Sequence, residues 1–189
     1  MSNLKTLVEA WQPKQKKSVK RNDTAYQQCL ETTTAELERL LEQYRTTVFE
    51  EDMRARLLRD SIDHHVRRYH KYAIQGSIKS HYNQKGVSMA SEDCIFEHVI
   101  PAGQVRDMLI DGALTINQAL NVPTCRVSRD NNKRLNDLGL HDHNSTPFYP
   151  FRRYKAAMGD STFETYNGQV TIDLESWSLE DHYKQFNIT

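Results

Sequence analysis

The segment Cys94-Ile-Phe-Glu-His-Val-Ile-Pro101 predicts a short β-strand, because it combines β-branched and aromatic residues and ends at a proline. A second strand is predicted at Thr124–Val127, after a helical insert of about 20 residues. Ser128 then has the character of an N-cap for a helix over Arg129–Leu138. The order strand, helical insert, strand, capped helix decides the fold expected for this part of the chain.

Side chains able to carry chemistry stand at two positions of this unit. Glu97 and His98 end the first strand, and Asn131 and Asn132 open the helix. Hydrolysis of a phosphodiester needs a base that takes a proton from water, and a histidine titrates near neutrality. It also needs positive charge at the phosphate, which a hard divalent ion held by one carboxylate and one amide oxygen can supply. The set therefore predicts a metal-dependent phosphodiester hydrolase.

With these motifs the chain resembles the HNH, or ββα-metal, endonucleases over residues 94–139, through Glu97-His98 in FEHVIP and Asn132 in CRVSRDNNKRL. The resemblance implies that His98 is the general base and that Glu97 and Asn132 hold one divalent metal, Mg²⁺ or Mn²⁺. It also implies DNA as the substrate, with RNA left open. The chain departs from the common family pattern in three ways: it has Glu-His in place of Asp-His, it lacks a four-cysteine zinc knuckle, and it carries the helical insert.

Each of these residues also has a structural interpretation. His98 would then be a half-buried strand residue, and Asn132 would hydrogen-bond locally in the first turn of its helix. The catalytic interpretation is favoured by Arg126, Arg129 and Lys133, which gather around the predicted helix and are expected to contact phosphate.

Downstream segments offer further candidates. His141-Asp-His143 has a spacing that could chelate a metal from a strand, or it could lie near the active site and touch phosphate. Phe148–Tyr154 interleaves aromatic residues with Arg152 and Arg153, which either hold phosphates or belong to a segment that docks on the core. Cys125 is interpreted as a plain strand cysteine rather than a nucleophile.

Upstream, apolar residues recur at helical spacing over Thr24–Val48 and again over Phe49–Ala73. Two long amphipathic helices in succession predict either an antiparallel hairpin or part of a homodimer interface. The second helix contains a locally basic stretch, Asp63–Lys71, which is either its solvated face or a surface that follows a phosphate backbone.

Before these helices, Gln12–Arg21 carries five positive charges and no acid. The segment is either a solvated linker or a flexible arm that lies along phosphates. At the other end, Asn167-Gly168 predicts a β-hairpin between Thr162–Tyr166 and Gln169–Asp173, followed by a short helix that Ser178 opens. The connection over Gly76–Asp93 is predicted to be irregular.

Composition limits the class of protein. The 189 residues carry 25 Lys and Arg against 25 Asp and Glu, and no run is long and apolar enough for a membrane span, so no membrane partner is expected. The three cysteines are odd in number and far apart, which argues against a disulfide framework or a cysteine-only zinc site. Their use fits the reducing cytoplasm.

The sequence therefore predicts a mainly helical α+β chain with an N-terminal long-helix hairpin, a small ββα-metal module and a C-terminal β-hairpin. The alternative function is a non-catalytic nucleic-acid-binding or assembly protein that uses the long helices and carries a degenerate ββα unit. The expected division begins with a basic arm over residues 1–22 and a helical region over residues 23–82. A catalytic module over residues 83–158 and a C-terminal hairpin with a short helix over residues 159–189 complete it.

Overall fold

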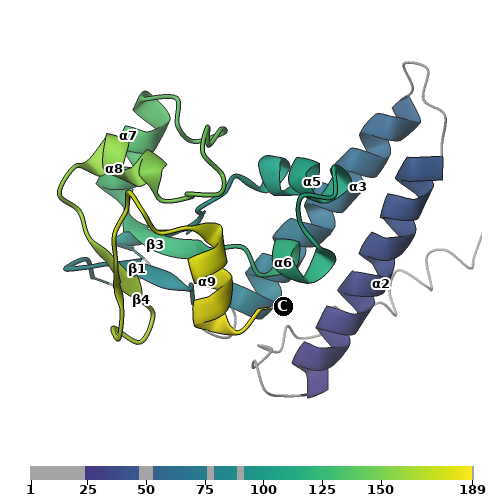
Figure 1. The fold of residues 1–189 in the computed structure, drawn as a ribbon, viewed down its shortest axis with the longest axis horizontal. Helices are drawn as coiled ribbons and strands as arrows, with labels where there is room; N and C mark the ends of the chain where they lie inside the picture. The colour runs from purple at the N-terminus through teal and green to yellow at the C-terminus, as the bar shows by residue number, and fades with distance from the viewer. Residues whose placement is uncertain (1–23, 47–52, 76–78, 89–91, 189) are drawn as a thin grey trace, which may run out of the picture.

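The computed structural model describes residues 24–46, 53–75, 79–88 and 92–188 (Figure 1). The predicted basic arm over residues 12–21 and the predicted start of the second long helix at residues 49–52 lie outside these ranges. The fold is α+β and mainly helical, as predicted.

The N-terminal half is built on two long helices, α2 (Thr24–Thr46) and α3 (Met53–Tyr69), which pack against each other within one chain. The two helices therefore form a hairpin, which was one of the two predicted arrangements. Helix α3 continues without a break into a π-helical turn, η1 (His70–Ile74). The insert between the two central strands forms α5 (Ala102–Ile110) and α6 (Ile116–Leu120), which lie against α3 (Figure 1).

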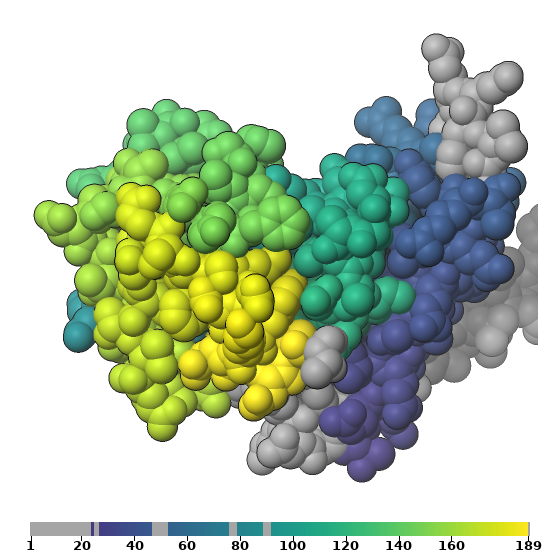
Figure 2. Space-filling model, viewed as in Figure 1, coloured from purple at the N-terminus to yellow at the C-terminus, as the bar shows by residue number. Residues whose placement is uncertain are grey.

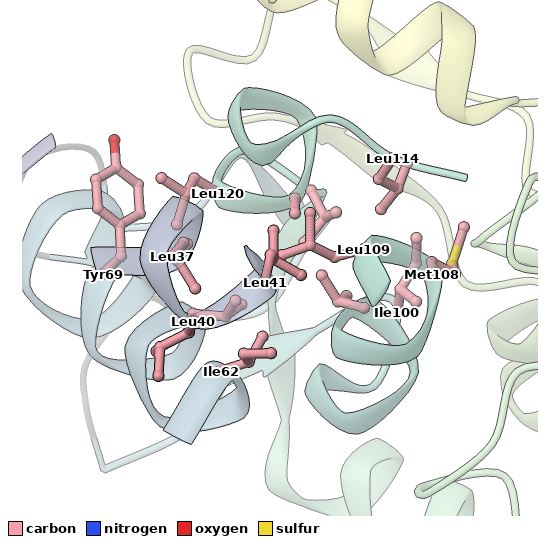
Figure 3. Close-up of a cluster of buried hydrophobic side chains, with 14 of the residues drawn as sticks. Leu37, Leu40, Leu41, Ile62, Tyr69, Ile100, Met108, Leu109, Leu114 and Leu120 are labelled. Atoms are coloured by element: carbon pink, nitrogen blue, oxygen red, sulfur yellow. The ribbon is translucent and has the colours of Figure 1, made fainter. Parts of the chain in front are cut away.

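Apolar side chains from α2, α3, α5 and α6 meet in one buried cluster (Figure 3). Leu37 and Leu41 from α2 face Ile62 from α3 and Leu109 from α5 there, and all four are at most 5% exposed. The insert is therefore not a loop on the unit formed by β2, β3 and the helix that follows β3. It is the surface by which that unit packs on the helical hairpin.

The sheet has five strands in the order β2-β3-β1-β4-β5. Its β1–β3 pair is parallel and its other pairs are antiparallel. The strands are β1 (Tyr82–Gln84), β2 (Cys94–His98), β3 (Thr124–Ser128), β4 (Phe163–Thr165) and β5 (Thr171–Ile172). The predicted central strands and the C-terminal hairpin are thus present.

Strand β1 corrects the prediction of an irregular connection over Gly76–Asp93. Its three residues carry no pattern of their own, but Tyr82 is fully buried and the strand is paired on both sides by β3 and β4. The predicted division between residues 82 and 83 falls inside this strand. The C-terminal hairpin belongs to the same sheet as the ββα unit.

Helices α7 (Arg129–Asp137) and α8 (Arg152–Met158) pack with the sheet around a second buried cluster. Ser128 caps α7 as predicted, with its hydroxyl accepting from the Asn131 backbone amide at 3.2 Å. Helix α9 (Leu179–Phe186) follows its predicted cap, Ser178, and the C-terminal segment crosses the face shown in Figure 2.

Candidate active site at the end of strand β2

Strand β2 ends between the two buried clusters, and its last residues point to opposite sides of the sheet. Glu97 pairs with Cys125 and His98 with Thr124 in the antiparallel ladder to β3. Successive side chains of a strand alternate between faces, so Glu97 turns toward the sheet cluster and His98 toward the helical half. Because they stand at the strand end, both side chains nevertheless line one pocket of about 240 Å³. Its other lining residues are Arg67, Phe96, Pro101, Ala102, His141 and Asp142.

Glu97 is held by a buried arginine. Nη2 of Arg153 donates to Oε1 of Glu97 at 2.9 Å. The side chain of Arg153 is 2% exposed, and that of Glu97 is 12% exposed. Burial raises the pKa of Glu97, and the positive charges of Arg153 and His141 offset part of that rise. The contact with Arg153 therefore opposes the protonation of Glu97 that burial favours.

The prediction that Arg153 contacts phosphate is wrong. Its guanidinium also donates to the backbone carbonyls of Leu140, His141 and His98 and to the Tyr154 hydroxyl. These bonds turn it inward and tie three segments together behind Glu97. Phe151 and Tyr154 are buried in the core, as the docking alternative expected, whereas Phe148 and Tyr149 are exposed. Helix α8, which begins at Arg152, was not predicted from the sequence pattern.

His98 is half-buried, and its buried Nε2 atom is uncommitted. Its Nε2 makes no hydrogen bond with the described residues. The ring stands edge-on to Phe96, with 5.5 Å between ring centroids, and 4.9 Å from the ring of His70. Burial lowers the pKa of His98 well below its usual value, and the nearby His70, Arg67 and Arg153 lower it further. The ring is therefore neutral at pH 7, with a lone pair able to take a proton.

His70 lies behind His98 on the π-helical turn. Nε2 of His70 is 3.1 Å from the Leu120 carbonyl, which can only accept, so Nε2 carries the hydrogen and Nδ1 the lone pair. Nδ1 is buried and has no partner among the described residues. Burial lowers the pKa of His70 to about 4. Single π-helical turns often occur at functional sites, and this one places a neutral histidine against the candidate base.

Asn132, the third motif residue, lies on the sheet-facing side of α7, three residues before the buried Leu135. Its Oδ1 is buried and has no hydrogen-bond partner among the described residues. The local hydrogen bond that the structural interpretation required is therefore not seen at this oxygen. Asn132 does not, however, belong to the residues that line the 240 Å³ pocket.

The side-chain oxygens of Glu97 and Asn132 are the candidate ligands of a divalent ion. Among the residues that the structure describes, no three His, Cys, Asp or Glu side chains converge as a metal cage. Mg²⁺ does not require such a cage, because it usually keeps several waters and takes one or two protein oxygens together with substrate phosphate. Oε2 of Glu97, which forms no hydrogen bond within the described chain, and the orphaned Oδ1 of Asn132 are donors of that kind. Both are the type of oxygen that a hard ion prefers.

The three residues predicted to contact phosphate, Arg126, Arg129 and Lys133, lie in different surroundings. Arg126 stands directly opposite Phe96 on β3, on the same face as His98, and is half-buried. Arg129 donates from Nε to the Glu92 carbonyl at 2.6 Å, and Lys133 forms an exposed ion pair with Asp137. These last two lie on the exposed side of α7, away from the pocket lining.

Arg152 is also engaged, since its Nε donates to the Glu175 carbonyl at 2.8 Å and its guanidinium lies 4.2 Å from the centre of the Tyr149 ring. His141 and Asp142 form an exposed pair, 2.9 Å apart, and line the pocket beside Glu97. The His141 segment thus lies beside the candidate site, and its contact with phosphate stays a prediction.

One residue of the pocket wall, Arg67, comes from far upstream in the sequence. Arg67 lines the pocket of Glu97 and His98 and also a neighbouring groove with Lys71. The basic stretch Asp63–Lys71 was the available signal, but spacing alone did not separate a solvated face from one turned toward His98.

Burial excludes a cysteine nucleophile. Cys125 is fully buried, and desolvation raises the pKa of its thiol to about 12, so it is not a thiolate nucleophile at neutral pH. No described helix combines the length and apolar character needed to cross a membrane.

Comparison of the chain with family models, with curated proteins and with solved structures finds no match.

Proposed function

We propose that this protein is a metal-dependent endonuclease of the HNH type, which hydrolyses phosphodiester bonds in DNA. The observation that carries the proposal is the uncommitted Nε2 of His98, on a ring kept neutral by burial, in one pocket with Glu97 and Arg67. A structural histidine at a strand end normally finds a hydrogen-bond partner for its buried nitrogen. A catalytic base leaves that nitrogen for its substrate.

In the proposed reaction His98 accepts the proton of the attacking water as the new oxygen–phosphorus bond forms. The bond from phosphorus to the leaving oxygen breaks, and that oxygen departs with the electron pair and takes a proton from solvent. Arg67 contacts a non-bridging phosphate oxygen and offsets the charge that develops there. Arg153 keeps Glu97 oriented at the pocket wall. Glu97 and Asn132 would hold one Mg²⁺ or Mn²⁺, which when bound supplies positive charge to the phosphate and the leaving oxygen.

The site of action is proposed to be the cytoplasm. Cys29, Cys94 and Cys125 are all free thiols, and Cys94 and Cys125 are buried. Free buried thiols are typical of proteins that fold in a reducing compartment.

The test is incubation of the purified chain with double-stranded plasmid and with circular single-stranded DNA, in Mg²⁺, in Mn²⁺ and in EDTA. The proposal expects nicked or linear products with either ion and none with EDTA. Binding of either DNA without cleavage under all three conditions would overturn it in favour of the non-catalytic nucleic-acid-binding protein.

A further inference from the structure

A groove of about 510 Å³ runs beside the candidate active site, lined by Arg67, Lys71, Gln75, Phe96 and His98. We propose that this groove binds single-stranded DNA, with the phosphates held by Arg67, Lys71 and Arg126 and an unpaired base stacked on Phe96. The inference rests on the proposed function, since it names the form of DNA that reaches His98.

One wall of the groove is a stripe on the α3–η1 helix. Arg67, Lys71 and Gln75 are each four residues apart, and all three are exposed. Nε of Arg67 donates to Oδ2 of Asp63 at 2.6 Å, which orients the side chain while its two Nη groups make no hydrogen bond to the described residues. Lys71 has no ion-pair partner in the described part of the chain. Within the described chain the wall therefore presents the unpaired ammonium of Lys71 beside the guanidinium of Arg67, whose Nη groups are free although Asp63 offsets its charge.

The opposite side is the face of the sheet that carries His98. Arg126 lies directly across from Phe96 in the β2–β3 ladder, and cross-strand partners share a face. Its side chain makes no hydrogen bond or ion pair with a described residue. Cations thus border Phe96 from the helix and from the neighbouring strand, a pattern complementary to a polyanion rather than to a basic or apolar partner.

Phe96 distinguishes a single strand from a duplex. It is half-buried, it lines both the groove and the candidate active-site pocket, and its ring stands edge-on to that of His98. Positively charged grooves with an aromatic residue on their floor are the usual binding sites for single strands, because an unpaired base can stack on the ring. In a duplex the bases are stacked on one another and only the backbone would reach the rim.

The experiment measures binding of the full chain to dye-labelled oligo(dT) and to a duplex of the same length by fluorescence anisotropy, in EDTA so that nothing is cleaved. The variants are Phe96→Leu, Phe96→Tyr, Lys71→Ala and Arg126→Gln, with Lys184→Ala as a charge-matched control on α9. Melting temperatures are measured in parallel.

The single strand is expected to bind more tightly than the duplex. Phe96→Leu should weaken single-strand binding about tenfold and Phe96→Tyr should restore it, because stacking on an aromatic face contributes about 1–3 kcal/mol per base. Lys71→Ala and Arg126→Gln should each flatten the dependence of log K on log salt by about 0.7, and Lys184→Ala should change neither quantity.

Equal binding of single strand and duplex, or wild-type salt dependence in the exposed Lys71→Ala variant, would overturn the inference whether or not Phe96→Leu folds. The outcome is separable from that for the nuclease. Groove-dependent single-strand binding without cleavage in Mg²⁺ would remove the proposed function alone, whereas cleavage of duplex unaffected by groove substitutions would remove this inference alone.

Discussion

Arg152 and Arg153 are neighbours in the sequence, yet their surroundings in the fold differ. Arg153 is 4% exposed and joins Glu97 to backbone carbonyls on both sides of the pocket. Arg152 is half-exposed at the start of α8. Composition gave the two residues the same prediction, because it records that charge and aromatic groups alternate but not which side of the helix turns inward. Only the fold separates them.

Replacing Arg153 should therefore destabilise the protein far more than replacing its neighbour. Arg153→Met leaves Glu97 buried without its partner, and removing one member of a buried ion pair typically costs about 3–5 kcal/mol. Arg152→Met loses an exposed contact and should cost less than about 1 kcal/mol. Urea unfolding of both variants measures the difference. Equal losses would show that the guanidinium does not hold this part of the fold together.

His182 sits in a directed chain of buried hydrogen bonds. Nε1 of Trp177 donates to the Tyr82 hydroxyl at 3.0 Å, and Nε2 of His182 donates to the Asn121 carbonyl at 2.7 Å. The Tyr82 hydroxyl then donates to Nδ1 of His182 at 3.0 Å. A proton on Nδ1 would break this last bond, so the chain requires a neutral ring. Burial accordingly lowers the pKa of His182 to about 4.

The consequence is a loss of stability in acid. Between about pH 6.5 and 4 the unfolded state binds a proton at His182 that the folded state does not, so stability falls as the pH is lowered through this window. The contribution is on the order of 3 kcal/mol at pH 4. In His182→Gln the loss between pH 7 and pH 4 should be smaller than in wild type, while the exposed His64→Gln should match wild type. If His182→Gln loses as much stability between pH 7 and pH 4 as wild type, protonation of the His182 ring is not the cause of the loss.

At the scale of elements, the parts that could be predicted are those whose signal is local. Pro101 ends the segment after β2, Ser128 caps α7, and Asn167-Gly168 makes the C-terminal turn. Strand β1 and the π-helical turn η1 had no such signal. β1 forms because two neighbouring strands flank it, and η1 because its buried face meets the α5–α6 insert.

Helix α7 is predicted to bring a metal ligand, Asn132, to the site. If Oδ1 of Asn132 contacts the ion, Asn132→Ala should raise the Mg²⁺ concentration for half-maximal cleavage at least about tenfold, and Asn132→Asp should retain most of the wild-type response. The rise of the melting temperature with Mg²⁺ should shrink in parallel, since it reports ion binding independently of activity. Asn136→Ala, exposed on the same helix, is the control. A wild-type Mg²⁺ response in Asn132→Ala would remove this residue from the site.

At the scale of the whole molecule, the candidate site is a junction between two cores. Glu97 is fixed from the sheet side by Arg153, and His98 is packed from the helical side against His70. The motif residues were recognisable in the sequence because they are close together in it. Their neighbours were not, because Arg67 and His141 lie on segments whose approach depends on how the insert packs the hairpin against the sheet. A homodimer through the long helices stays a prediction.

The basic arm also belongs to this scale, although residues 12–21 lie outside the described structure. Its five positive charges have no acidic residue among them. If they contact duplex phosphates, deleting residues 1–21 should flatten the dependence of log K on log salt by ~0.9 per lost contact, about two to four units in all. The rate at saturating DNA should not change. An unaltered slope in the binding titration would make the arm a linker and leave Arg67 and Lys71 as the source of affinity.

The central claim is that His98 takes the proton of the attacking water, and the most direct measurement is the single-turnover rate of DNA cleavage in Mg²⁺ at saturating protein. His98→Ala is expected to lower this rate about a hundredfold or more, as loss of a general base does. Its DNA affinity should be retained and its melting temperature nearly so, and His64→Ala on the exposed side of α3 should cleave at the wild-type rate. A folded His98→Ala protein that cleaves as fast as wild type would contradict the account, as would a variant whose loss of activity is matched by collapse of the fold.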